Sequence, residues 1–240
     1  MENWSRGKLV ASPGQLVRKV SELLGISEAS VVQHDRNLVV AGLRSKSGRG
    51  SSAARMTARD AAHLLVAVLG SHHVKDSVQS VRGYRETRLS EYMSTGYQES
   101  SVTALTSLPP DHSFVDAVEA LVAAAADGSL GQAMYEAIDE IQGVKIGFPP
   151  IIQITVQSPH QVGDISIGGE EVGIARPSLY GYGRYALLDP WSQHKSLDIP
   201  VEELEAWRQK AEEYHVDTDL TQVRQITAKT VFAVGELLRT

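Results

Sequence analysis

The chain has 240 residues, of which 42% are hydrophobic and 22% are charged, values typical of a soluble globular protein with more than one domain. The sequence contains no cysteine, which excludes disulfides and thiolate metal sites. It also lacks an apolar run of the roughly 18 residues that a membrane helix requires.

The net charge of −6 is distributed unevenly along the chain. Residues 1–75 contain 11 Lys and Arg against 5 Asp and Glu, which gives this part a charge of +6 and leaves −12 for residues 76–240. A basic segment followed by an acidic body predicts a polyanionic partner for the first part. Random unevenness between two domains is the alternative explanation.

Two short helices are predicted in the basic part. Apolar residues at helical spacing predict a helix over 13–24, which Gly25 ends by adopting the left-handed conformation. Ser27 is a good N-cap for a second helix, which ends at about Ala41.

A polar, basic loop over 44–52 separates these helices from a third, which begins at Thr57, is capped by Asp60 and ends at Gly70. Residues 71–112 predict a partly helical connector. The elements expected after it are helices at 113–128 and 130–141, a strand at 151–156, a hairpin about Gly168-Gly169, a strand at 179–188, and helices at 200–214 and 219–239.

Residues 17–36 have the pattern of a helix-turn-helix, with Gly25 at the turn. The apolar positions that would lock the two helices together are Val20, Leu24, Ile26 and Val31. The following AGLRSKSGRGSSAARMT is similar to the segment that closes the recognition helix and enters the basic hairpin of winged helix-turn-helix regulators. The resemblance is at the level of the superfamily and covers about residues 13–70.

Two features depart from that pattern. His34 and Asp35 lie where such proteins often have aliphatic residues, so either the helix phase differs by one position or the buried face is unusually polar. The loop that would form the wing contains no β-branched residue, which makes its strand signal poor.

The resemblance implies which residues contact DNA. The second helix would read base edges in the major groove, and the loop would contact phosphates or the minor groove. The residues expected to read bases are Glu28, Ser30, Gln33, His34 and Asn37. The residues expected at phosphates or in the minor groove are Arg36, Arg44, Lys46, Arg49 and Arg55.

Other candidate sites are weaker. His72 and His73 are adjacent, and neighbouring side chains point in different directions, so no metal site is expected. The tyrosines around Arg184 could stack on bases but more often form an edge strand. No catalytic motif or phosphate loop is present, and we expect neither an enzyme nor a cofactor.

The expected fold is α+β: a mainly helical winged helix-turn-helix domain over 1–75, a connector over 76–112, and a mixed domain with a small antiparallel sheet over 113–240. The expected function is that of a cytoplasmic, sequence-specific transcriptional regulator of bacterial or phage type. Its partners would be double-stranded DNA and a second copy of the chain. The 219–239 helix is expected to form an oligomer or interdomain contact. The C-terminal domain could bind an effector or a protein partner. That helix could instead cover the sheet of its own domain.

The alternative function is that of an assembly protein, similar to phage small-terminase subunits or to replication and partition proteins that bind DNA. Phage small terminases combine an N-terminal helix-turn-helix with an oligomerising C-terminal part. The oligomeric state separates the two interpretations, because a dimer favours the regulator and a large ring favours assembly.

Overall fold

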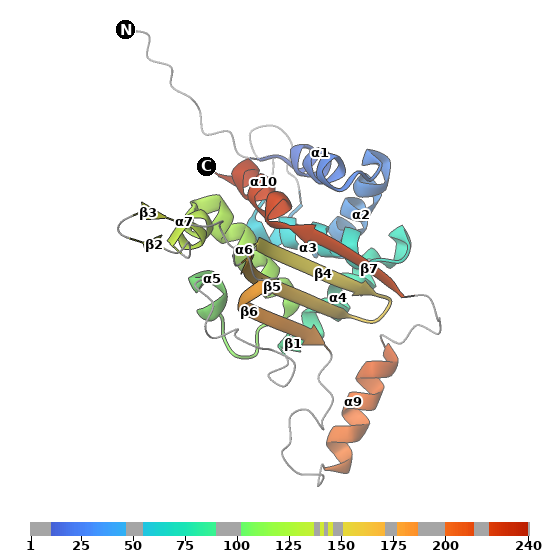
Figure 1. Ribbon diagram of the computed structural model, residues 1–240. Coiled ribbons are helices and arrows are strands. Elements are labelled where there is room, and N and C mark those ends of the chain that lie inside the picture. Colours follow the sequence, from blue (N-terminus) through green and yellow to red (C-terminus); the bar gives the residue numbers. More distant parts are fainter. Residues whose placement is uncertain are drawn as a thin grey trace.

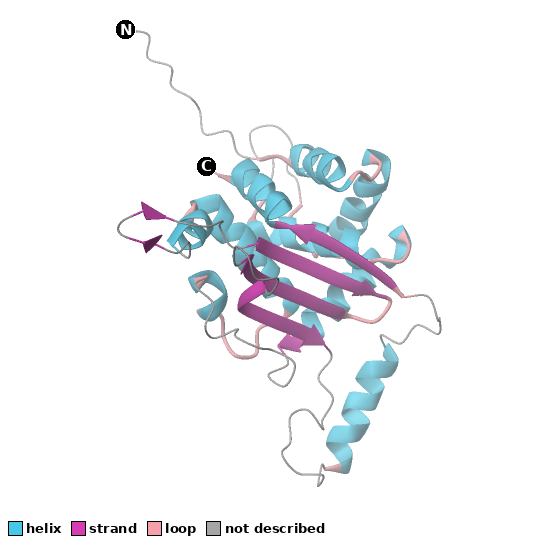
Figure 2. Cartoon of the chain, viewed as in Figure 1, coloured by secondary structure: helices cyan, strands magenta, loops and turns pink. Residues whose placement is uncertain are grey.

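In the computed structural model, helices pack against one face of an antiparallel sheet (Figure 1, Figure 2). The α+β class expected from the sequence is therefore confirmed. The structure describes residues 11–46, 55–89, 102–136, 140–141, 144–145, 151–170, 177–186, 200–213 and 221–239.

The helices begin and end where local signals predict. Reciprocal capping boxes start three of them, at Ser12–Gln15, Thr57–Asp60 and Ser113–Asp116. The helical elements are α1 (Pro13–Leu24), α2 (Glu28–Val40), α3 (Ala58–Gly70), the 3₁₀ turn η2 (Val74–Asp76), α4 (Ser77–Glu86), α5 (Thr103–Thr106), α6 (Phe114–Asp127), α7 (Ser129–Glu136), α9 (Val201–Glu213) and α10 (Ala228–Leu238).

Within the described residues, the main sheet has five strands in the order β1-β6-β5-β4-β7, and every neighbouring pair is antiparallel. A separate pair joins β2 to β3. The strands are β1 (Arg88–Leu89), β2 (Glu140–Ile141), β3 (Val144–Lys145), β4 (Ile151–Ser158), β5 (Val162–Glu170), β6 (Pro177–Ala186) and β7 (Gln222–Thr227).

The helix-covered face of the sheet is apolar and closely packed. Phe114 of α6 lies over Gly163 of β5, and Tyr84 of α4 donates a hydrogen bond to the carbonyl oxygen of Gln157. The buried sheet residues are Ile152, Ile154, Val156, Ile165, Ile167 and Ile226. On β4 these alternate with outward-facing residues such as exposed Gln153, as expected for a sheet with one covered face.

Helix α3 lies at the centre of the helical layer. Eleven of its thirteen residues are buried, from Asp60 to Gly70. It packs against α4 and α6 and also contacts β4. Buried side chains from Ala11 to Leu238 form one cluster, so residues on both sides of the expected domain boundaries share a core. The boundaries themselves stay predictions.

The hairpin expected about Gly168-Gly169 is wrong. Strand β5 continues through both glycines, and the chain reverses between β4 and β5 at residues 159–161. The register between β5 and β6 shifts between Ile167 and Gly168. Glycines inside a strand often mark an irregularity rather than a turn, and here the pairing skips Tyr180 on β6 opposite this point.

The helix expected over 130–141 ends earlier. Helix α7 stops at Glu136, and Ile141 in β2 pairs with Val144 in β3. Both residues are β-branched, which favours a strand over a helix.

The helix expected over 219–239 is also wrong in its first part. Residues 222–227 form the edge strand β7, and α10 begins only at Ala228. Val223 and Ile226 fit a helical spacing, but the burial of β7 follows a period of two: Ile226 faces the core, and Val223 is 61% exposed. Val234 on α10 is fully buried, and the helix packs against α6, α3 and α1, so its apolar side belongs to the core of the chain. A contact of this helix with a second copy stays a prediction.

Two helical glycines should respond in opposite directions to the same change. A Cβ at Gly235 would lie 2.5 Å from the Cβ of Ala125 on α6, whereas at Gly131 the nearest atom, on Phe232, is 3.8 Å away. We expect Gly131→Ala to raise the free energy of unfolding by about 0.5–1 kcal/mol through helix propensity. Gly235→Ala should lower it by about 1–3 kcal/mol, because α10 must move away from α6. Urea denaturation measures both, and equal effects would contradict the described packing.

Candidate nucleic-acid interface

Helices α1 and α2 are joined by a short turn and pack against each other. Gly25 ends α1 with φ +64°, and the side chain of Ser27 accepts a hydrogen bond from the backbone of Ser30 at the start of α2. The connection consists of residues 25–27 only. The helices pack against each other, with Val20 and Val31 fully buried.

Helix α2 has one packed face and one exposed face. Val31, His34, Asp35 and Leu38 point into the protein and are buried. The opposite face contains Ala29, Gln33, Arg36 and Val40, all exposed, and Val40 is 88% exposed. Residues at these spacings lie within one narrow stripe of a helix with 3.6 residues per turn. In the described part of the chain, no element covers this stripe.

The packed face of α2 is unusually polar, because it contains both His34 and Asp35. Of the two explanations for these residues, the polar buried face is therefore the one that the structure supports. His34 is 5% exposed, and its Nδ1 lies 2.8 Å from the Oγ of Ser77 on α4. Asn37 donates a hydrogen bond from Nδ2 to the carbonyl oxygen of Val74, at 2.8 Å. Both side chains therefore hold α2 against η2 and α4.

Asp35 makes a buried ion pair with Arg44. The Nη2 of Arg44 donates to Oδ2 of Asp35 at 2.8 Å, and the Nε of Arg44 contacts Oδ1, so the ion pair is bidentate. The side chains are 4% exposed for Arg44 and 11% for Asp35. Arg44 also donates to the carbonyl oxygen of Ser45. Arg44 thus fixes the start of the basic loop from inside the protein.

The carboxylate of Asp60 holds both ends of the basic loop. Its Oδ1 accepts from the backbone of Ser45 at 2.9 Å, and its Oδ2 accepts from the backbone of Thr57 at 3.0 Å. The loop therefore leaves and rejoins the fold at one place. Lys46 and Arg55, the described residues nearest its two ends, are both exposed. Residues 47–54, which include Arg49, lie outside the described residues.

The structure separates the residues expected at DNA into three groups. Glu28, Gln33, Arg36, Lys46 and Arg55 are exposed. Ser30 is half-buried, and its hydroxyl lies 2.8 Å from that of Ser27. His34, Asn37 and Arg44 make contacts within the fold and are not free to reach bases or phosphates in this conformation.

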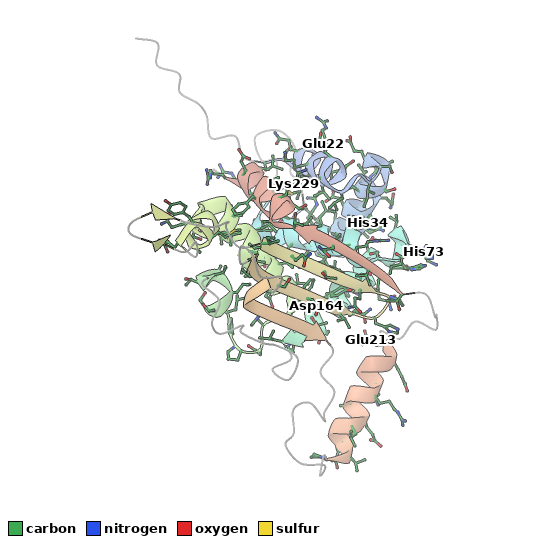
Figure 3. All side chains as sticks on the ribbon, in the orientation of Figure 1. Glu22, His34, His73, Asp164, Glu213 and Lys229 are labelled. Atoms are coloured by element: carbon green, nitrogen blue, oxygen red, sulfur yellow. The ribbon has the colours of Figure 1, made fainter. Side chains whose placement is uncertain are left out.

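One cation beside α2 was missed by sequence reasoning. Lys75 is exposed on η2, the turn whose Val74 carbonyl accepts from Asn37. His73, the residue before η2, is also exposed and lies on the same side of the molecule as His34 (Figure 3). Nothing in the local sequence indicates this placement, because η2 is brought to α2 only by tertiary packing.

A cleft of about 840 Å³ opens between α3, α4 and α6. Its charged lining residues, apart from His112, are Arg59, Arg82, Arg85, Arg88, Glu86, Asp111, Asp116 and Glu119. Arg59 forms an ion pair with Glu119, and Asp116 accepts hydrogen bonds from Ser113. Among the described lining residues, four arginines face four carboxylates, so these residues give the cleft no net charge that would select an anion.

Among the described helices, none is both long and apolar enough to cross a membrane. No group of three or more His, Asp or Glu in the described part of the chain is arranged to hold a metal ion. Comparison of the chain with protein-family models, with curated proteins and with solved structures finds no significant match.

The buried ion pair should be sensitive to the loss of one partner. Arg44→Ala leaves the carboxylate of Asp35 buried without its cation, and we expect it to lower the free energy of unfolding by about 3–5 kcal/mol. The double change Asp35→Leu with Arg44→Met should cost less than Arg44→Ala. The control is Arg59→Ala, which removes an ion pair whose arginine is 62% exposed and should cost below about 1 kcal/mol. A loss for Arg44→Ala no larger than for Arg59→Ala, in chemical denaturation, would show that the pair does not anchor the loop.

His34 should make the fold sensitive to acid. Burial, followed by the nearby charge of Arg224, lowers the pKa of His34 from 6.5 to about 4. Between these two pH values the unfolded chain binds a proton at His34 and the folded chain does not, so the free energy of unfolding falls as the pH falls. His34→Asn keeps a neutral polar atom near Ser77 and should reduce this fall by about 1–3 kcal/mol. Denaturation at pH 7 and pH 4.5 tests this, and identical pH dependence of the two proteins would rule it out.

Proposed function

We propose that this chain binds duplex DNA by placing the exposed face of α2 in the major groove. The observation that supports the proposal most strongly is the division of α2. One face is held by buried contacts, while the opposite face presents Gln33 and Arg36 to solvent. The major groove of B-DNA admits one α-helix, and polar side chains on its outer face can then reach base edges.

The charges around α2 fit a polyanion. Arg36, Lys46 and Arg55 are exposed, and none makes an ion pair or side-chain hydrogen bond within the described residues. Lys75 adds a cation at the side of α2 where Asn37 meets Val74. Contacts from such residues to phosphates set the affinity and register on DNA without reading the sequence.

Within this proposal, the protein acts as a sequence-specific regulator of transcription. Binding as a dimer would join two half-sites and supply the specificity that one small module lacks. The dimer contact is not assigned to α10, because the buried side chains of that helix pack inside the chain.

The proposal predicts DNA binding that weakens steeply with salt. Each phosphate contact adds roughly 0.9 to the negative slope of log K against log salt, because counterions are released on binding. Arg55→Ala should therefore weaken binding to all duplexes alike and reduce the slope by about 1. The matched control is Arg208→Ala on α9, an exposed arginine far from α2 in Figure 1. Fluorescence anisotropy with a random duplex at several salt concentrations measures both effects. Binding that is absent, or that does not change with salt, would refute the proposed function.

A further inference from the structure

A short chain of hydrogen bonds fixes the orientation of one exposed side chain on α2. The Nδ2 of Asn37 donates to the carbonyl oxygen of Val74 at 2.8 Å. The Nε2 of Gln33 then donates to Oδ1 of Asn37 at 3.0 Å. A backbone carbonyl can only accept, so Val74 determines which way the Asn37 amide faces. The Asn37 amide in turn determines which way the Gln33 amide faces.

The fixed amide of Gln33 retains both kinds of hydrogen-bonding group. A glutamine side chain has two N–H donors and one carbonyl acceptor. One N–H of Gln33 is used by Asn37, which leaves the other N–H and the oxygen Oε1. Gln33 is exposed on the same stripe of α2 as Arg36, so this donor–acceptor pair faces outward.

Only one base presents the matching pair on its own edge in the major groove. Adenine has the N7 acceptor beside the N6 donor, whereas guanine presents two acceptors. Cytosine presents a donor, and thymine an acceptor and a methyl group. A glutamine held with one N–H and its oxygen free can therefore pair with adenine through two hydrogen bonds.

We propose that Gln33 reads an adenine and that Asn37 is a positioning residue that never touches DNA. The proposal rests on the proposed function, since it names the base that the exposed face of α2 selects. It also divides two residues that the sequence analysis placed together as base readers. Preorganisation is the physical reason: Asn37 and Val74 fix the Gln33 amide before DNA binds, so less side-chain freedom is lost on binding.

The test begins with selection of duplexes bound by the full chain from a random library. The enriched sequence should contain one adenine that Gln33 reads. Replacing this adenine by 7-deazaadenine removes the N7 acceptor, and the protein should bind the modified duplex about 5- to 10-fold more weakly. Gln33→Ala should bind the unmodified and modified duplexes equally. Asn37→Ala should keep its affinity for random DNA within about 2-fold and lose most of the discrimination at that adenine.

The matched control is Gln132→Ala on α7. This change also removes a hydrogen bond from a glutamine to a residue four positions later, here Glu136 at 2.6 Å, and should leave the discrimination intact. Thermal unfolding of each variant shows whether the fold survives. The Gln33→Ala comparison stands independently of Asn37→Ala, because Gln33 is exposed and its loss leaves the packed face of α2 intact.

The outcomes distinguish failure of the proposed DNA binding from failure of the adenine assignment. If the wild-type chain binds no duplex, the proposed function fails and the adenine assignment fails with it. If an enriched sequence appears but Gln33→Ala remains as sensitive to 7-deazaadenine as the wild type, only the adenine assignment is overturned. If a folded Asn37→Ala discriminates as well as the wild type, Asn37 does not position Gln33.

Discussion

The guanidinium of Arg224 joins the sheet to α3, one of the helices against which α2 packs. From the edge strand β7, its Nη1 donates to the carbonyl oxygens of Val68 at 2.7 Å and Ser71 at 2.9 Å, at the end of α3. The last carbonyls of a helix have no partner within it and attract positive charge, so a cation here both satisfies and stabilises them. Arg224 thereby ties the sheet to the most deeply buried helix. Its charge also contributes to the lowered pKa of His34 on the packed face of α2.

Polar contacts between α2 and its neighbours determine how α2 is rotated about its own axis. Apolar residues alone tolerate several packings, but His34 on Ser77 and Asp35 on Arg44 are satisfied in one orientation only. That orientation turns Gln33 and Arg36 outward and holds the start of the basic loop beside α2. The polar layer costs desolvation, and we infer that its benefit is a fixed outer face.

Local chemistry made much of the fold predictable. Gly25 as the end of α1, Ser27 as the N-cap of α2, and Thr57 with Asp60 at the start of α3 are confirmed, because each signal lies within a few residues. Segments with two compatible patterns were predicted wrongly. Residues 219–227 suit both a helix and a strand, and only pairing with β4, which is distant in sequence, selects the strand.

The candidate site was predictable to the same degree. The resemblance places Gln33 and Arg36 among the DNA contacts, and both are exposed on α2. Their contact with DNA stays a prediction. The inward roles of Arg44 and Asn37, and the position of Lys75, depend on partners such as Asp35 and Val74 that no local pattern identifies.

The absence of cysteine from the sequence allows a direct test of where DNA binds. Single cysteines at Ala29 and Val40 on the outer face of α2, and at exposed Ala206 on α9, would each report accessibility through their rate of alkylation. The account predicts that saturating duplex DNA slows alkylation at positions 29 and 40 several-fold and leaves position 206 unchanged. Bound DNA that protects neither position on α2 would contradict it.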